Sequence, residues 1–460
     1  MDERIELEER PPPASLWGRF RYLGPGLIVT GSIVGSGELI LTTSLGAQAG
    51  FTLLWLIILS CIVKVFLQIE LGRYAISSGE TTLDGFQRVP GPRLCVSWIV
   101  WCWFAMAIAS VIQLSGILLY AAEPFVMLWR STSLHLWTPS IALATMVLLS
   151  TGRYRIVELP TTIMVFLFTM ASLLIGLSLQ GTELYAIKGS DLMSGLRFAV
   201  PEREDWLNLA IGAFGVTGVG ATELVWYPYW CMEKGYGKFA GPRREGPDWV
   251  ERARGWIRVM QTDAWVSLVV YTSATVAFYF LGAAVLNRDF LAGRGEIPSN
   301  DKQSLETLGA IYTRTLGRSL GEAVFIVGAF AVLYSTFFVA TASGARLFAD
   351  FGRVVGWFRF RNEDHRRRCV AILCLLIPIF CWIVQFSFRE PRTLILIGAI
   401  GQFCMLPFIA LATVYLRYCH TDPRIRPSRV ADSFLWVAFG FMSAFGIYKA
   451  IDELRKVFSA

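Results

Sequence analysis

Long runs of apolar residues alternate with short stretches that carry the charges along this chain. A helix that crosses a bilayer needs about 20 mostly apolar residues, and only the run at 138–151 is clearly short of this. The pattern predicts an all-α membrane protein with eleven transmembrane helices. The expected spans are 24–47, 51–77, 96–128, 138–151, 156–180, 207–231, 262–286, 320–343, 369–387, 393–417 and 433–451.

The composition supports a membrane protein over a soluble one. Of the 460 residues, 54% are hydrophobic and 17% are charged, whereas a soluble domain carries about 25% charged residues. The net charge of +7 is confined largely to the segments between the runs, so we expect a lipid bilayer as partner and no nucleic acid. The chain shows no CxxC pair, no P-loop and no nucleophile–base pair, so we expect neither a cofactor nor an enzyme.

The distribution of Lys and Arg predicts how the chain is threaded through the membrane. Cytoplasmic loops are rich in these residues, and the most basic segments here are 232–262 and 345–368. Both face the cytoplasm if the N-terminus does, and an odd number of spans then places the C-terminus outside. We expect a multi-pass protein of the plasma membrane, which in a bacterium is the inner membrane.

Two of the expected spans carry glycines and a carboxylate at mid-membrane depth. The first contains Gly-Ser-Gly-Glu-Leu and the sixth contains Gly-Ala-Thr-Glu-Leu. Glycine weakens a helix, and a charge at this depth is costly unless it lines a cavity. Because the near-copies are five spans apart, they favour an inverted repeat whose two broken spans form a binding site. The predicted site residues are Gly35, Ser36, Gly37, Glu38, Gly220, Ala221, Thr222 and Glu223.

Several stretches resemble the natural resistance-associated macrophage protein (Nramp) family of divalent-metal transporters. They are GPG at 24–26, the run at 51–79, GRYRIVELP at 152–160 and MLPFIAL at 405–411. The resemblance implies the LeuT-type fold, with two inverted five-span repeats, broken spans 1 and 6, and an added eleventh span. The expected divisions are a tail at 1–21, a first repeat at 22–181, an extracytoplasmic loop at 182–206, a second repeat at 207–420, and the last span and tail at 421–460.

The site motifs depart from the family's pattern. Family members carry Asp-Pro-Gly-Asn in the first span, where residues 35–38 of this chain read Gly-Ser-Gly-Glu. They carry Met-Pro-His in the sixth span, where residues 220–222 read Gly-Ala-Thr. The acidic residue of the family's proton pathway in span 3 matches Gln113. The groups that the family uses for transition-metal selectivity and proton coupling are therefore absent.

The remaining site residues favour a hard cation. Glu38 and Glu223 would place two carboxylates in one cavity, where hydroxyl groups, backbone carbonyls and water supply further oxygens. An all-oxygen site suits Mg²⁺, Ca²⁺ or Mn²⁺. The first hypothesis is a secondary transporter that moves Mg²⁺ or Mn²⁺ by alternating access, with these two glutamates as metal ligands.

Lys64 lies in the middle of the second span, where a charge needs a partner. We expect Glu38 or Glu223 to be that partner, and we count Lys64, Gln113 and Gln402 as candidate coupling or charge partners. If Lys64 instead attracts the substrate, the protein carries a small anion or zwitterion at its exposed helix ends. The third hypothesis is a membrane sensor that transports nothing. The oligomeric state is left open, and a monomer would suffice.

Four aromatic residues lie near the inner end of the sixth span. They are Trp226, Tyr227, Tyr229 and Trp230. Aromatic residues gather at membrane interfaces, so we expect an interfacial belt. The alternative is that they form one wall of a pocket.

Overall fold

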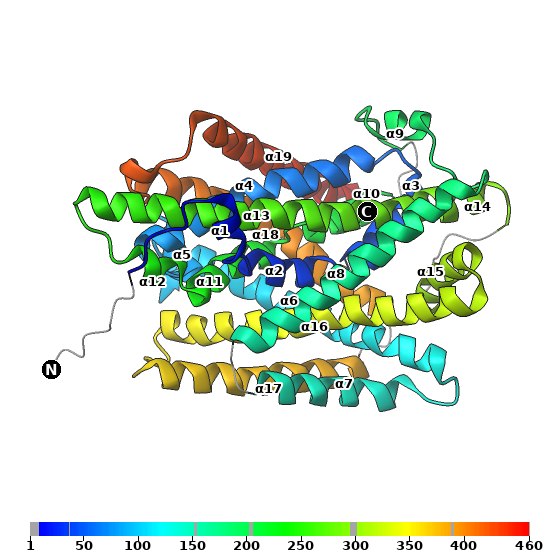
Figure 1. Ribbon diagram of the computed structural model, residues 1–460, viewed down its shortest axis with the longest axis horizontal. Helices are drawn as coiled ribbons and strands as arrows, with labels where there is room; N and C mark the ends of the chain where they lie inside the picture. Colours follow the sequence, from blue (N-terminus) through cyan, green and yellow to red (C-terminus); the bar gives the residue numbers. More distant parts are fainter. Residues whose placement is uncertain are drawn as a thin grey trace.

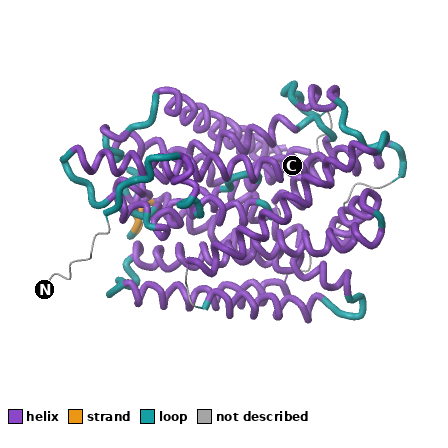
Figure 2. The backbone as a smooth tube through the Cα atoms, viewed as in Figure 1, coloured by secondary structure: helices purple, strands orange, loops and turns teal. Residues whose placement is uncertain are grey.

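The protein is described by a computed structural model covering residues 9–35, 37–150, 154–201, 206–294, 301–387 and 391–459. Helices make up nearly all of its regular structure (Figures 1 and 2). The first half contains α1 (Leu16–Phe20), α2 (Pro25–Ile33), the π-helix η1 (Gly37–Thr42), α3 (Thr43–Ala49), α4 (Leu54–Ser78), α5 (Thr82–Gln87), the short hairpin β1 (Arg93–Leu94) and β2 (Val96–Ser97), α6 (Trp98–Leu128), α7 (Leu134–Leu149), α8 (Tyr154–Ser178), η2 (Leu179–Gly181) and α9 (Gly189–Gly195).

The described residues of the second half form only helices between their loops. It contains α10 (Trp206–Val216), α11 (Ala221–Lys234), α12 (Tyr236–Ala240), α13 (Pro247–Leu281), the π-helix η3 (Gly282–Leu286), α14 (Asn287–Leu291), α15 (Asp301–Leu316), α16 (Arg318–Val355), α17 (Glu363–Ser387), α18 (Pro391–Cys419), η4 (Pro423–Ile425) and α19 (Arg429–Ser459).

The number of spans agrees with the sequence. Within the described residues, nine helices are long and apolar enough to cross a membrane. A tenth span is the pair Pro25–Ile33 and Gly37–Ala49, which is bent by 45° at its break. The shorter apolar helix α7 corresponds to the short fourth span. Ten of the predicted spans are thus confirmed, and α7 lies at the position of the remaining one.

Most of the spans lie lengthwise along the molecule (Figure 1). α7 and α17 pack side by side along one edge, next to α16, whereas α19 lies near the opposite edge. The broken spans, α2–η1–α3 and α10–α11, lie inside the bundle, and most of their described residues are buried. Irregular backbone at membrane depth is tolerated in such a position because protein groups replace the missing backbone partners.

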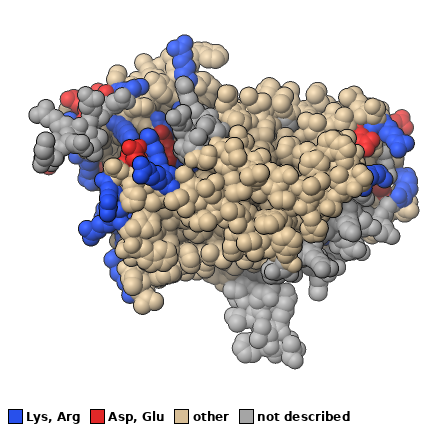
Figure 3. All heavy atoms as spheres, turned by 90° about the horizontal axis from the view of Figure 1, so that it is seen from below, with Lys and Arg blue, Asp and Glu red and all other residues tan. Residues whose placement is uncertain are grey.

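The charged side chains gather at the two ends of the molecule (Figure 3). On the face shown, the described surface between these ends carries almost no Lys, Arg, Asp or Glu. Such a band is expected where a protein meets hydrocarbon, because exposed charges are costly there. On this face Lys and Arg gather mainly at the end where α12 and the start of α13 lie, which we call the basic end.

Two segments that the sequence presents as loops are partly helical. The loop expected at 232–262 contains α12, and α13 begins within it at Pro247 and leads through η3 and α14 to Leu291. α16 continues beyond its expected end at 343 to Val355. Proline suits the first position of a helix because its missing N–H is not needed there. Hydropathy marks where a helix leaves the lipid and not where it ends, so these polar extensions were missed.

Candidate functional site

Span 1 breaks between α2 and η1. Ser36 lies outside the described residues, so its role stays a prediction. Glycine at position 35 allows a close approach to α16, because a Cβ there would lie 1.7 Å from Thr336 Oγ1. The same hydroxyl donates to the Ser32 carbonyl at 3.1 Å. α16 thus satisfies a carbonyl that the break releases from the helix.

Span 6 breaks between α10 and α11. Gly218 has a φ of +64°, in the left-handed region that favours glycine. A Cβ at this position would lie 3.1 Å from Cys61 Sγ on α4. Gly220 is the N-cap of α11, and a Cβ there would lie 2.5 Å from Glu223 Oε2. The glycines therefore let the backbone pass α4 and leave space for the carboxylate.

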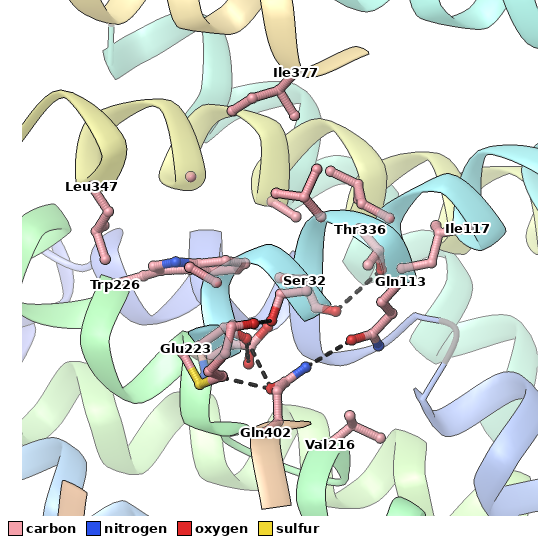
Figure 4. Close-up of a pocket in the computed structure, with 18 of the residues that line it drawn as sticks. Ser32, Gln113, Ile117, Val216, Glu223, Trp226, Thr336, Leu347, Ile377 and Gln402 are labelled. Carbon is pink, nitrogen blue, oxygen red and sulfur yellow. Dashed lines mark hydrogen bonds between the residues drawn. The ribbon is translucent and has the colours of Figure 1, made fainter. Parts of the chain in front are cut away.

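A cavity of about 60 Å³ lies beside the two breaks (Figure 4). Glu223 forms the centre of its polar wall: Oε1 accepts a hydrogen bond from Ser32 Oγ at 2.8 Å, and Oε2 accepts one from Thr222 Oγ1 at 2.7 Å. The two halves of the fold meet at this carboxylate, since Ser32 belongs to α2 and Glu223 to α11. The polar wall includes Ser32, Ser110, Gln113, Thr222, Glu223, Thr336 and Gln402.

Two amides continue the polar wall away from Glu223 (Figure 4). Gln402 Oε1 accepts from Thr222 Oγ1 at 2.9 Å, and Gln402 Nε2 donates to Gln113 Oε1 at 2.9 Å. Because the Thr222 hydroxyl has one proton, it serves Glu223 or Gln402 at any one time. The mid-span amides of α6 and α18 are thus brought together at the candidate site.

The cavity extends from the breaks toward the basic end. Its lining on α6 runs back from Ile117 to Trp103, near the start of that helix, and its lining on α16 runs from Thr336 to Phe348. The start of α6 and the end of α16 lie at the basic end (Figure 1). Trp226 also lines the cavity. The part of the cavity toward the basic end is therefore mostly apolar, whereas the part beside the breaks is polar.

The aromatic residues of span 6 do not form an interfacial belt. Trp226, Tyr227, Tyr229 and Trp230 are all buried. The Tyr229 hydroxyl donates to Asp350 Oδ2 on α16 at 2.5 Å, and Trp226 forms part of the cavity wall. The belt prediction was wrong because α11 is covered by its neighbours, which a single sequence does not reveal.

Glu38 is fully buried, yet it is not among the residues that line the cavity. Its Oε1 accepts from the Gly218 N–H at 3.1 Å and from the Thr275 hydroxyl at 3.4 Å, and its Oε2 accepts from the Gly35 N–H at 3.4 Å. The carboxylate therefore contacts both breaks. Glu38 and Glu223 share no hydrogen-bond partner among the described residues, and their joint metal site stays a prediction.

Lys64 is fully buried, and its partners are backbone carbonyls. Nζ donates to Phe214 O and to Thr217 O, each at 2.6 Å, and lies 4.8 Å from the centre of the Phe214 ring. The predicted direct ion pair with Glu38 or Glu223 is wrong within the part of the chain described. The end of α10 can hold an ammonium because a helix C-terminus carries unpaired carbonyls and a partial negative charge.

Two further residues of the site were not singled out from the sequence. Ser32 lies just before the glycines of span 1, and a hydroxyl beside a break was an available signal. Thr336 lies in an uninterrupted apolar run, which gives no such signal. Of the other predicted positions, Gly37 lines the cavity and Ala221 is the first residue of α11.

We compared the chain with known protein families, with curated proteins and with solved structures. The family model described as natural resistance-associated macrophage protein-like, or Nramp, matches residues 26–452. This chain belongs to the Nramp family. A divalent metal cation transporter MntH of Xanthomonas campestris is 25% identical to this Nramp protein over 422 residues, which are 88% of this chain and 84% of the relative. An uncharacterised protein of Pasteurella multocida is 29% identical over 185 residues, 39% of this chain and 41% of that protein.

Solved structures confirm the LeuT-type fold of this Nramp protein. A manganese transporter of Eremococcus coleocola superposes with a TM-score of 0.67 at 15% identity, over 98% of this chain and 90% of that one. MhsT in complex with L-phenylalanine superposes with a TM-score of 0.59 at 14% identity, over 95% of this chain and 98% of that one. At these identities the likeness concerns the fold alone, and it makes the chain a multi-pass membrane protein of two inverted repeats.

Within the described residues, no group of three or more His, Cys, Asp or Glu side chains is arranged so that it could hold a metal ion. Among the described residues that line the cavity, Glu223 carries the one carboxylate, beside hydroxyl and amide groups and the thioether of Met106. This lining contains no imidazole.

Proposed function

We propose that this protein is a secondary transporter of a small hard divalent cation, Mg²⁺ or Mn²⁺, which binds at Glu223. The observation that carries the proposal is the set of oxygens around this carboxylate: Ser32 Oγ at 2.8 Å, Thr222 Oγ1 at 2.7 Å, and the amides beyond. Carboxylate, amide and hydroxyl oxygens suit Mg²⁺ and Mn²⁺. Family membership and relatives named as divalent metal cation and manganese transporters support the substrate class.

The cavity is large enough for an ion and several waters. A water needs about 10–15 Å³ of such space, so about 60 Å³ holds several waters. Mg²⁺ gives up its hydration shell reluctantly and keeps several waters in most protein sites. A cation at Glu223 would retain part of its shell, with Thr222 and Gln402 as partners for those waters.

The contacts of Lys64 argue against the alternative of an anion substrate. It requires the Lys64 ammonium to face the solute, whereas that group is bound to two carbonyls at the end of α10. The cavity wall carries a carboxylate, which repels an anion.

Alternating access would use the two breaks as hinges. The cavity extends from Glu223 toward the basic end, which the charge rule assigns to the cytoplasm. Closing this passage and opening the opposite side would carry the ion across. Broken spans at the centre of inverted repeats support this kind of movement.

The test is uptake by the purified protein in liposomes, with Mg²⁺ and Mn²⁺ followed by fluorescent indicators inside. We expect saturable uptake that Glu223→Gln abolishes. We also expect this change to raise the dissociation constant in calorimetry by about tenfold or more, because charged ligands set the affinity of such sites. The control is Glu251→Gln, which neutralises an exposed carboxylate on α13. Folded protein that takes up neither ion would contradict the proposal.

A further inference from the structure

The peptide group that joins Thr217 to Gly218, in the break of span 6, is held from both of its sides. The Thr217 carbonyl accepts a hydrogen bond from Lys64 Nζ at 2.6 Å. The N–H of Gly218 belongs to the same peptide group and donates to Glu38 Oε1 at 3.1 Å. One planar peptide thus separates a buried ammonium from a buried carboxylate.

The dipole of this peptide suits the charges on its two sides. Its positive N–H faces the carboxylate and its negative carbonyl faces the ammonium. Hydrogen bonds to charged groups are roughly twice as strong as neutral ones, and bonds in a chain polarise one another in a dry interior. Lys64 and Glu38 therefore stabilise each other through the peptide, although they form no direct ion pair.

Neighbouring groups fix the position of the same peptide. Ser60, one turn before Lys64 on α4, donates to the Thr217 carbonyl at 3.2 Å. The Thr217 hydroxyl lies 3.2 Å from the Thr42 hydroxyl on η1. A Cβ at Gly218 would lie 3.4 Å from Tyr271 on α13, in addition to its contacts with α4. Three elements converge on this one peptide, and the two charged bonds are the strongest of its contacts.

We infer that Lys64 and Glu38 are positioning residues that clamp the Thr217–Gly218 peptide. Glu223 stands in the first turn of α11, just after the clamped peptide, so a rotation of that peptide moves the carboxylate. A rotation must break both charged bonds. The clamp therefore controls how readily span 6 changes its angle during transport, and affects much less how tightly the cation binds. This inference rests on the proposed function.

The chain offers a matched control on the same face of α4. Gln68 lies one turn beyond Lys64 and is fully buried. Neither its amide nitrogen nor its amide oxygen has a hydrogen-bond partner in the described structure. Gln68→Met therefore changes a buried polar side chain of span 2 without touching the clamp.

The experiment compares Lys64→Met, Glu38→Gln, their double variant and Gln68→Met. Uptake in liposomes gives the maximal rate, calorimetry with Mn²⁺ gives the dissociation constant, and melting of the purified protein reports folding. Because a rotation must break both charged bonds, each clamp variant should raise the maximal rate by about tenfold to a hundredfold, the factor that corresponds to one charge-assisted bond, with less than about a threefold change in the dissociation constant. The double variant should gain less than the product of the two single gains, because the two bonds strengthen each other through the peptide.

Three results would overturn the clamp. One is a rate for Lys64→Met equal to that of Gln68→Met. Another is a double variant whose gains in rate multiply, because independent sites behave in this way. The third is a parallel fall in rate, binding and melting temperature, which a structural role alone would produce.

The failure of the proposed function is a separate outcome. If the unaltered protein neither binds nor carries a divalent cation, the melting temperatures of the four variants still test the clamp. Shifts that fail to add in the double variant support a shared peptide, and additive shifts overturn it.

Discussion

Single glycines decide where the helices of this Nramp protein can break. Gly35 and Gly218 stand where a Cβ would meet α16 and α4 at short distances. Gly212, six residues before Gly218 in the same span, would place its Cβ 3.5 Å from the nearest atom, which is ordinary contact. The glycines of one span therefore have different roles, one permitting a break and the other only lying in a helix.

Gly218→Ala should destabilise the protein, whereas Gly212→Ala should not. The left-handed φ at Gly218 costs an alanine about 1–2 kcal/mol, and the contact with Cys61 adds to this. At Gly212 the helical backbone gains up to about 1 kcal/mol from alanine. Melting temperatures in detergent check both variants. Equal melting temperatures for the two would contradict the assignment of the break to Gly218.

At the scale of elements, the start of α2 is held by one side chain of α13. Asp263 is buried and accepts from the Gly24 N–H at 2.9 Å, the Gly26 N–H at 2.6 Å and the Tyr227 hydroxyl at 3.1 Å. The first N–H groups of a helix lack partners within it, and a carboxylate there also suits the helix dipole. α2, α11 and α13 are thus fastened together on the basic side of the cavity.

Asp263→Asn should loosen this junction. The amide keeps one acceptor oxygen but turns an NH₂ group toward a backbone N–H, and breaking a charged hydrogen bond costs about 1–3 kcal/mol. We expect a lower melting temperature and faster proteolysis near Gly24. Glu251→Gln, on the same helix but exposed, is the control. If the two variants are equally stable, the junction contributes nothing.

The sequence predicts the elements better than it predicts their polar contacts. Apolar runs gave the eleven spans, and the repeated Gly-rich motifs gave the two breaks, because hydrophobic length and glycine act locally. The partner of Lys64 could not be obtained in this way. The sequence suggested that the Lys64 ammonium would pair with a carboxylate. Broken spans also contain backbone carbonyls that lack a partner within the helix, and the order of side chains does not show where these carbonyls lie. The contact between Gln113 and Gln402 likewise depends on how α6 packs against α18.

At the scale of the whole molecule, the charges at the two ends predict the orientation in the membrane. The exposed Cys95 lies in the hairpin between α5 and α6, at an inner loop of the expected topology. A maleimide that cannot cross membranes should modify it in inside-out vesicles but not in intact cells. Cys95→Ser identifies the modified site. Modification in intact cells would reverse the proposed orientation.

The length of α13 gives the molecule a lever arm. The helix begins at Pro247, well before the expected membrane entry at 262, so at 1.5 Å per residue about 22 Å of it projects at the basic end. α1 and α12 pack on this arm, and its membrane-embedded part carries Thr275, which touches Glu38. A tilt of about 10° at the breaks would swing the tip by about 4 Å over that length. Small angular changes around the ion thereby produce larger displacements outside the bilayer. Distance measurements between spectroscopic labels on this arm can detect these displacements without altering the site.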